Sequence, residues 1–93
     1  LLLCSGLDSV GVRKLADLTA ESCGGTAAVF SENTDGSFSY CLIRRGGDLR
    51  SFNKEMTAAL HGRGGGKPEC QMGSVRSDRE SILKHFVSFY IPE

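Results

Sequence analysis

The stretch HGRGGGKPECQMGS, from His61 to Ser74, separates two well-patterned parts of this 93-residue chain. Four glycines precede Pro68 in it, and Arg63 and Lys67 stand among them. Because glycine has no Cβ atom, other groups can approach the backbone of such a segment closely. We therefore expect a glycine-rich loop that joins a helix to the last strand of the domain and lies against another group.

Two explanations of this glycine segment stay open. Its backbone N–H groups, with Arg63 and Lys67, are suited to bind an anion. Alternatively, the segment is a flexible connector whose glycines let a helix and a strand pack closely. The common nucleotide loops do not fit, because a P-loop requires Ser or Thr where this chain has Pro68, and a dinucleotide loop requires glycine in place of Lys67.

The length of 93 residues allows one domain with a modest core. Hydrophobic residues make up 40% of the chain and charged residues 24%, which is typical of globular proteins and argues against a disordered or fibrous chain. No apolar run approaches the ~20 residues of a membrane-spanning helix. We expect a small globular domain without a membrane partner.

The four cysteines, Cys4, Cys23, Cys41 and Cys70, are irregularly spaced. No pair has the C-x-x-C spacing of a zinc or redox motif, and the two histidines do not complete a metal site. Cys41 lies inside an apolar pattern, as a buried free thiol does. We expect reduced thiols, no metal in this chain and a cytoplasmic location; an extracellular disulfide framework is the alternative.

The net charge is zero, but the charges are unevenly distributed along the chain. Residues 1–43 contain two basic and five acidic residues, whereas residues 44–79 contain eight basic and four acidic residues. A basic segment in a neutral domain indicates a local anion-binding site rather than non-specific coating of nucleic acid.

Apolar periodicity, caps and turn residues predict five elements before the glycine segment. The predicted strands are Leu1–Cys4, which is apolar enough to be buried on both faces, then Thr26–Phe30 and Ser37–Arg44. The predicted helices run from a cap at Asp8 or Ser9 to Gly24, and from Asp48 to Leu60.

Beyond the glycine segment, Glu69–Val75 is predicted as a fourth strand, and Ser77 with Glu80 forms a capping box that opens a final amphipathic helix. The expected fold is α/β (α+β): a mixed four-stranded sheet with three packed helices, in the order β-α-β-β-α-β-α. The first crossover should make strands one and two parallel, and the turn Asn33–Gly36 should make strand three antiparallel.

The string Gly62-Arg63-Gly64-Gly65-Gly66-Lys67-Pro68-Glu69, followed by Gln71 and Gly73, resembles the glycine motif of the DHH-associated domain. The likeness covers nearly the whole chain, including Cys23-Gly24-Gly25 at the end of the first helix and Ala27-Ala28-Val29-Phe30 in a strand. Such domains (C-Ala) form the C-terminal part of alanyl-tRNA synthetases and of AlaX-type alanyl-tRNA editing proteins. The resemblance implies that residues 1–93 are a single DHH-associated, C-Ala-like domain, a C-terminal fragment of a longer chain. Cys70–Val75 looks more like the AlaX type.

The resemblance implies a tRNA-binding accessory domain whose partners are tRNA, in particular tRNA for alanine, and a linked editing or synthetase domain. Editing hydrolyses mischarged tRNA at a zinc site in a separate domain, so zinc is expected there and no cofactor is expected here. No catalytic residue is assigned in this chain, because its serines have no partner base in the sequence and it contains no H-x-x-x-H motif. The parent protein is expected to be an aminoacyl-tRNA hydrolase or a ligase.

Two other functions stay open. In one, the domain is chiefly a dimerisation or scaffold module with a second copy as partner. In the other, it is the substrate-binding half of a DHH-type phosphoesterase. Those phosphoesterases carry a histidine after three glycines, where this chain has Lys67, which weakens the last alternative.

The expected RNA-binding residues share either a flexible backbone or a cationic side chain. Arg63 can grip a phosphate with two hydrogen bonds, and Lys67 offers a mobile point charge. Arg44 and Arg45 end the third strand, so we expect them at a common edge with the glycine segment. The predicted set is Arg63, Gly64, Gly65, Gly66, Lys67, Arg44, Arg45 and Arg76.

Overall fold

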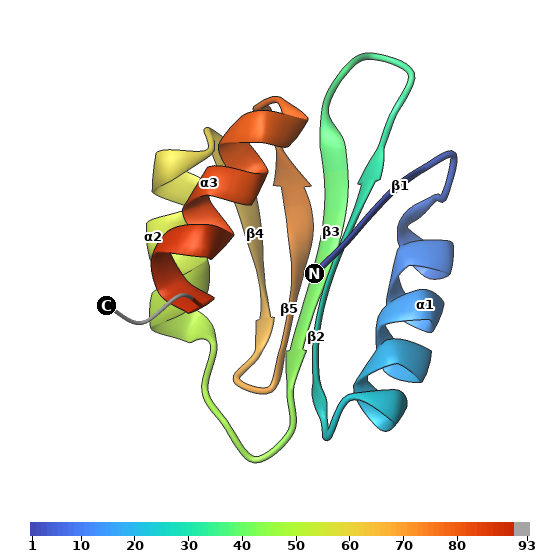
Figure 1. The fold of residues 1–93 in the computed structure, drawn as a ribbon, viewed down its shortest axis with the longest axis vertical. Coiled ribbons are helices and arrows are strands. Elements are labelled where there is room, and N and C mark those ends of the chain that lie inside the picture. The colour runs from blue at the N-terminus through green and yellow to red at the C-terminus, as the bar shows by residue number, and fades with distance from the viewer. Residues whose placement is uncertain (91–93) are drawn as a thin grey trace.

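The computed structural model describes residues 1–90, with side chains as far as Phe86, and shows a five-stranded mixed sheet between helices (Figure 1). In chain order the elements are β1 (Leu2–Ser5), α1 (Ser9–Ser22), β2 (Thr26–Glu32), β3 (Phe38–Arg44), α2 (Arg50–Ala59), β4 (Gly62–Lys67), β5 (Cys70–Val75) and α3 (Arg79–Tyr90). The α/β class and the predicted order of elements are confirmed. The structure adds one strand, β4, to the four that the sequence predicts.

The strand order in the sheet is β1-β2-β3-β5-β4. α1 connects β1 to β2, and these two strands are parallel, as the crossover predicts. The turn at Asn33–Gly36 joins β2 to an antiparallel β3, which confirms the predicted hairpin. β5 pairs with β3, so the β4–β5 hairpin forms the edge of the sheet opposite β1.

The glycine segment Gly62–Lys67 is an edge strand, and its prediction as a loop is wrong. It pairs with β5 from Gly62 opposite Val75 to Lys67 opposite Cys70, and Pro68 and Glu69 make the turn. Glycine has little intrinsic preference for strands. Backbone pairing with β5 and the packing of α2 over β4 therefore impose a strand that the local sequence does not signal.

Each face of the sheet carries its own hydrophobic core, because successive side chains of a strand point to opposite faces. α1 covers one face, and α2 and α3 cover the other (Figure 1). The core under α1 contains Val12, Ala16, Ala20, Ala27, Val29, Cys41 and Ile43. The larger core under α2 and α3 contains Ala28, Phe30, Phe38, Tyr40, Leu42, Met56, Leu60, Val75, Ile82 and Phe86.

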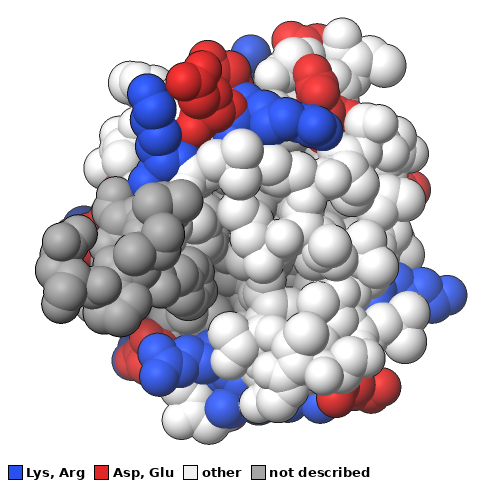
Figure 2. Space-filling model, in the orientation of Figure 1, with Lys and Arg blue, Asp and Glu red and all other residues white. Residues whose placement is uncertain are grey.

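β1 is the other edge strand, so its prediction as a strand buried on both faces is wrong. Its one hydrogen-bonded neighbour in the sheet is β2, and Leu2 is 40% exposed. In the space-filling view of Figure 2, the middle of the surface carries no charge and most charged side chains gather toward the top and bottom.

Side chains cap two of the helices. The Asp8 carboxylate accepts a hydrogen bond of 2.8 Å from the Gly11 N–H, as predicted for the start of α1. At the start of α3, Asp78 accepts from the Ser81 N–H at 2.8 Å, whereas Ser77 donates to the Leu60 carbonyl, so the predicted Ser77 cap is wrong. No helix in the described part of the chain is long and apolar enough to cross a membrane.

Candidate phosphate-binding surface

The residues of β4 divide between the two faces of the sheet. Lys67 pairs with Cys70, which belongs to the core under α1, so Lys67 and Arg63 lie on the α1 side. Gly64 lies on the other side, against Tyr40 in the core under α2 and α3. α1 packs on β2 and β3, which leaves the α1 side of β4 exposed to solvent.

Close packing explains three of the glycines in β4. A Cβ atom on Gly64 would lie 1.9 Å from the Tyr40 hydroxyl oxygen, and one on Gly62 would lie 2.4 Å from the Ser74 carbonyl oxygen. Gly66 has φ 143°, and a Cβ there would lie 2.4 Å from the Cys70 carbonyl oxygen. Close packing, which was one part of the connector explanation, therefore accounts for the glycines on the face of β4 that meets α2, but the segment is a paired strand and not a flexible connector.

Gly65 differs from these three glycines. It lies on the exposed α1 side, and a Cβ built on it would meet nothing within 4 Å. Arg63 and Lys67 flank it on the same face, four residues apart and thus about 13 Å apart along the strand. The exposed face of β4 is an open backbone strip with a cation at each end.

At the turn end of this strip, Lys67 shares a hollow of about 480 Å³ with Arg13 and Arg45. Asp17 pairs with both arginines, at 3.1 Å from Arg13 and 3.9 Å from Arg45. The Glu69 carboxylate, which also lines the hollow, accepts a hydrogen bond from the Gly46 N–H. Lys67 has no ion pair within the described residues, so its charge is available to a ligand.

At the other end, Arg63 and Arg76 line a second hollow of about 550 Å³ together with His61 and Ser74. Arg76 reaches Asp35 at 4.0 Å, a long and exposed ion pair that contributes little. Arg63 makes no ion pair in residues 1–86. This end therefore also presents cationic groups that are not neutralised.

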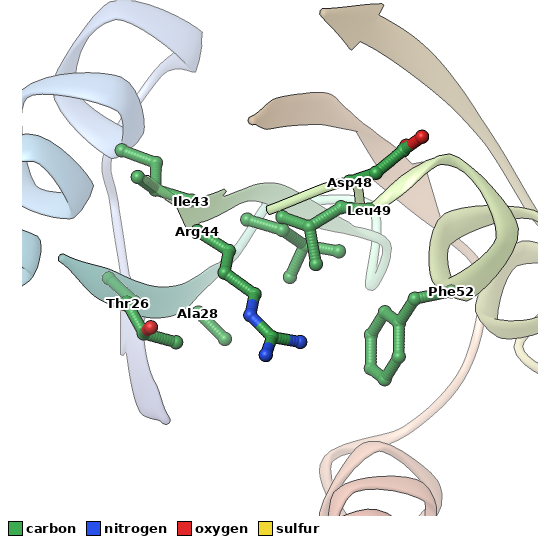
Figure 3. A pocket seen from close by; sticks show the side chains of 9 residues that line it. Thr26, Ala28, Ile43, Arg44, Asp48, Leu49 and Phe52 are labelled. Carbon is green, nitrogen blue, oxygen red and sulfur yellow. The ribbon is translucent and has the colours of Figure 1, made fainter. Parts of the chain in front are cut away.

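Arg44 lies on the opposite face from Arg45, because consecutive residues at the end of β3 alternate. Its side chain enters a cavity of about 370 Å³ that is lined by Leu49 and Phe52 on the α2 side (Figure 3). The stem passes over Gly47, where a Cβ atom would lie 2.8 Å from Arg44 Cγ. The structure thus separates Arg44 from the β4 strip.

The expected residues do not form one cluster. Lys67 and Arg45 meet at one end of β4, Arg63 and Arg76 meet at the other, and Arg44 lies on the far face. Gly64 and Gly66 are turned toward the α2 side, which leaves Gly65 as the accessible glycine between the cations. Sequence reasoning missed Arg13, because helix periodicity shows only that it lies on a polar face of α1, not that this face borders β4.

The described residues contain no group of three or more histidine, cysteine, aspartate or glutamate side chains arranged to hold a metal ion. The surface itself presents guanidinium and ammonium groups, which form charge-assisted hydrogen bonds with anions.

No family model matches the chain, and no curated protein sequence matches it. A solved structure does: the crystal structure of the C-Ala domain from Aquifex aeolicus alanyl-tRNA synthetase, with a TM-score of 0.65 and 18% sequence identity. The match covers 94% of this chain and 90% of that one. At this level of identity the similarity concerns the fold, and this chain has a C-Ala-like fold over nearly its whole length.

Proposed function

We propose that this domain binds RNA through the phosphate backbone, as an accessory domain of an alanyl-tRNA editing protein or an alanyl-tRNA synthetase. The observation that carries the proposal is the exposed face of β4, where Arg63 and Lys67, both without ion pairs in the described residues, flank the open backbone of Gly65.

The spacing of Arg63 and Lys67 suits a sugar-phosphate backbone better than a single phosphate group. The two cations lie about 13 Å apart on one face, too far to grip one phosphate together. Arg45 and Arg76 extend the positive surface beyond each end of the strip. Neither β4 nor the linings of its two hollows contain phenylalanine, tyrosine or tryptophan, and His61 in the second hollow is the one ring there that can stack on a base. The contacts of the cations with phosphates position RNA without reading its sequence.

The C-Ala-like fold supports the choice of tRNA as the RNA partner, because the matching solved domain belongs to an alanyl-tRNA synthetase. In this proposal, a linked domain outside residues 1–93 carries the chemistry. If that domain is an editing domain, it also holds the zinc ion, and tRNA for alanine is the substrate that the present domain helps to hold.

The test is tRNA binding by fluorescence anisotropy over a series of salt concentrations. Each neutralised phosphate contributes about 0.7–0.9 to the slope of log K against log salt. Arg63→Ala with Lys67→Ala should therefore weaken binding and flatten the slope by roughly 1.4–1.8. Arg63 and Lys67 are exposed, so their replacement should leave the fold intact, which circular dichroism checks.

Lys54→Ala with Arg79→Ala is the matched control, because it removes one lysine and one arginine from exposed positions away from the β4 strip. This control should keep nearly the full slope. Equal slopes for the two double variants would show that binding follows total charge, and β4 would then be only a structural strand.

Self-association is the second candidate function, and the β1 edge favours it. β1 has a free edge in the sheet, and Leu1 and Leu2 at this strand are 48% and 40% exposed. Free edges of this kind pair with other chains unless they are blocked. Light scattering tests this by measuring the molecular mass of the unmodified protein and of Leu2→Lys. A dimer that Leu2→Lys dissociates supports a dimerisation module. A monomeric mass for both proteins rules self-association out.

A further inference from the structure

Two of the four cysteines lie next to each other on the α1 side of the sheet. The Sγ atoms of Cys41 in β3 and Cys70 at the start of β5 are 3.8 Å apart. Ile43 pairs with Cys70 and Cys41 pairs with Met72, so the two thiols are diagonal neighbours across the strands. Their proximity is a consequence of strand register and cannot be read from their separation in sequence.

The two thiols differ in access. Cys41 is fully buried under α1, whereas Cys70 is partly exposed and lines the hollow that contains Arg13, Arg45 and Lys67. A reagent that enters this hollow therefore contacts Cys70 first, and the Cys41 thiol lies 3.8 Å from the Cys70 sulfur on the buried side.

The surrounding charges select the kind of reagent. Three cations and the two carboxylates of Asp17 and Glu69 line the hollow, which leaves a net charge of +1. Asp17 is paired with both arginines, so the unpaired charge is that of Lys67, and it favours an anionic reactant over a metal cation. A shared metal would also require further ligands, and the described residues contain no group of three that could supply them.

We propose that Cys41 and Cys70 form a reversible disulfide between β3 and β5, made by exchange with a small anionic disulfide that enters the cationic hollow. The Cys70 thiolate attacks one sulfur of the reagent, forms a mixed disulfide and releases the first thiolate. Cys41 then attacks Cys70 Sγ, and its proton passes to the departing sulfur of the reagent, which leaves as the second thiol. The protein dithiol is oxidised by two electrons, and the reagent disulfide is reduced to two thiols.

Strand geometry makes this bond a strained one. The Cα atoms of diagonal neighbours lie roughly 7–8 Å apart, beyond the usual disulfide range of about 4.4–6.8 Å. Because Cys70 already pairs with Ile43, closure must shorten the diagonal by shifting the start of β5 along β3 toward Cys41. Cys70 directly follows the turn at Pro68 and Glu69, and this turn is already tied to β3 by a 2.9 Å hydrogen bond from the Arg44 N–H to the Glu69 carbonyl. Strained disulfides are easily reduced, which makes the bond reversible.

Closure also moves Lys67, because Lys67 is paired with Cys70 across the hairpin. The disulfide thus changes the position of a cation in the phosphate-binding surface. An effect on RNA binding rests on the function proposed above, whereas formation of the bond and displacement of Lys67 do not.

The experiment treats the Cys4→Ser, Cys23→Ser variant, which retains the pair, with oxidised glutathione as the anionic disulfide. Intact mass and peptide mapping should show a Cys41–Cys70 linkage with loss of two hydrogen atoms, reversed by excess reduced glutathione. Amide NMR should show a shift at Lys67 on oxidation. A mixed disulfide that persists on Cys70, or no reaction at Cys70, overturns the proposal.

Two further variants separate the steps. Adding Cys41→Ser should trap a stable glutathione adduct on Cys70, and adding Cys70→Ser should abolish both adduct and linkage. Arg45→Ala should slow the first step by roughly threefold to fivefold with oxidised glutathione, but not with the uncharged disulfide of 2-mercaptoethanol. Equal slowing with both reagents would show that the cationic hollow does not select the reagent.

Discussion

The Tyr40 hydroxyl occupies the space that a side chain on Gly64 would require. It donates a hydrogen bond of 2.5 Å to Asn53 Oδ1 on α2, and both residues are buried. A Cβ atom on Gly64 would lie 1.9 Å from that hydroxyl oxygen and 2.6 Å from the Met72 carbonyl oxygen. The tyrosine on β3 thus links α2 to the glycine strand, and this contact requires glycine at position 64.

Gly64→Ala should therefore destabilise the domain by about 3 kcal/mol, as overpacking in a tight core does. Gly65→Ala is the matched control, because a Cβ on Gly65 meets nothing within 4 Å. That change should be neutral or stabilise the strand by about 0.5–1 kcal/mol. Urea denaturation measures the free energy of unfolding of each variant. Similar free energies for Gly64→Ala and Gly65→Ala would contradict the packing of Tyr40 on Gly64.

Tyr40→Phe should destabilise the protein by about 1–3 kcal/mol, because it leaves Asn53 Oδ1 buried without its donor. The same change removes the atom nearest to a Cβ on Gly64. The double variant Tyr40→Phe, Gly64→Ala should consequently lose less free energy of unfolding than the two single variants lose together. Strict additivity in a double-mutant cycle would show that the two residues do not interact.

Burial raises the pKa of the Tyr40 phenol to about 12, whereas an unfolded chain titrates near 10. The folded state holds this proton more tightly, so the stability that it contributes is complete below pH ~10 and is lost as pH rises through about 12. Urea denaturation at pH values from about 10 to about 12 should show a decrease in the free energy of unfolding. Tyr40→Phe should make this decrease smaller. An absorbance titration of the native protein that places the Tyr40 transition near pH 10 would contradict this.

Arg44 and Arg45 should differ in RNA binding although they are adjacent in sequence. Arg45 lies in the hollow beside Lys67, and Arg44 enters the cavity on the other face. Arg45→Ala should flatten the salt slope of tRNA binding by about 0.7–0.9, and Arg44→Ala should change it little. A larger effect of Arg44→Ala would place the RNA on the α2 side of the sheet.

The four thiols should react in an order that follows their exposure. Cys23 is exposed, and Cys41 is fully buried with its pKa raised to about 12, chiefly by burial. In protein purified under reducing conditions, Cys23 should react rapidly with a thiol reagent and Cys41 only after denaturation. Titration of the denatured protein should count all four, and fewer would reveal a disulfide that the fold does not require.

Local sequence determined most of the elements, because their signals depend on near neighbours. The apolar alternation of Phe38–Arg44 and the turn chemistry of Asn33–Gly36 predict a hairpin that the structure confirms. The Asp8 cap and the helical spacing of apolar residues likewise predict α1. The distribution of charges along the chain also indicates a cationic segment at residues 44–79.

Only the tertiary structure decided what the glycine segment is. Nothing in Gly62–Lys67 favours a strand, and its conformation comes from backbone pairing with β5 and from Tyr40 packing on Gly64. The same pairing fixes which face each residue occupies. It therefore separates Arg44 from Arg45 and brings Cys41 to Cys70, because side-chain alternation and strand register are properties of the assembled sheet rather than of any one strand.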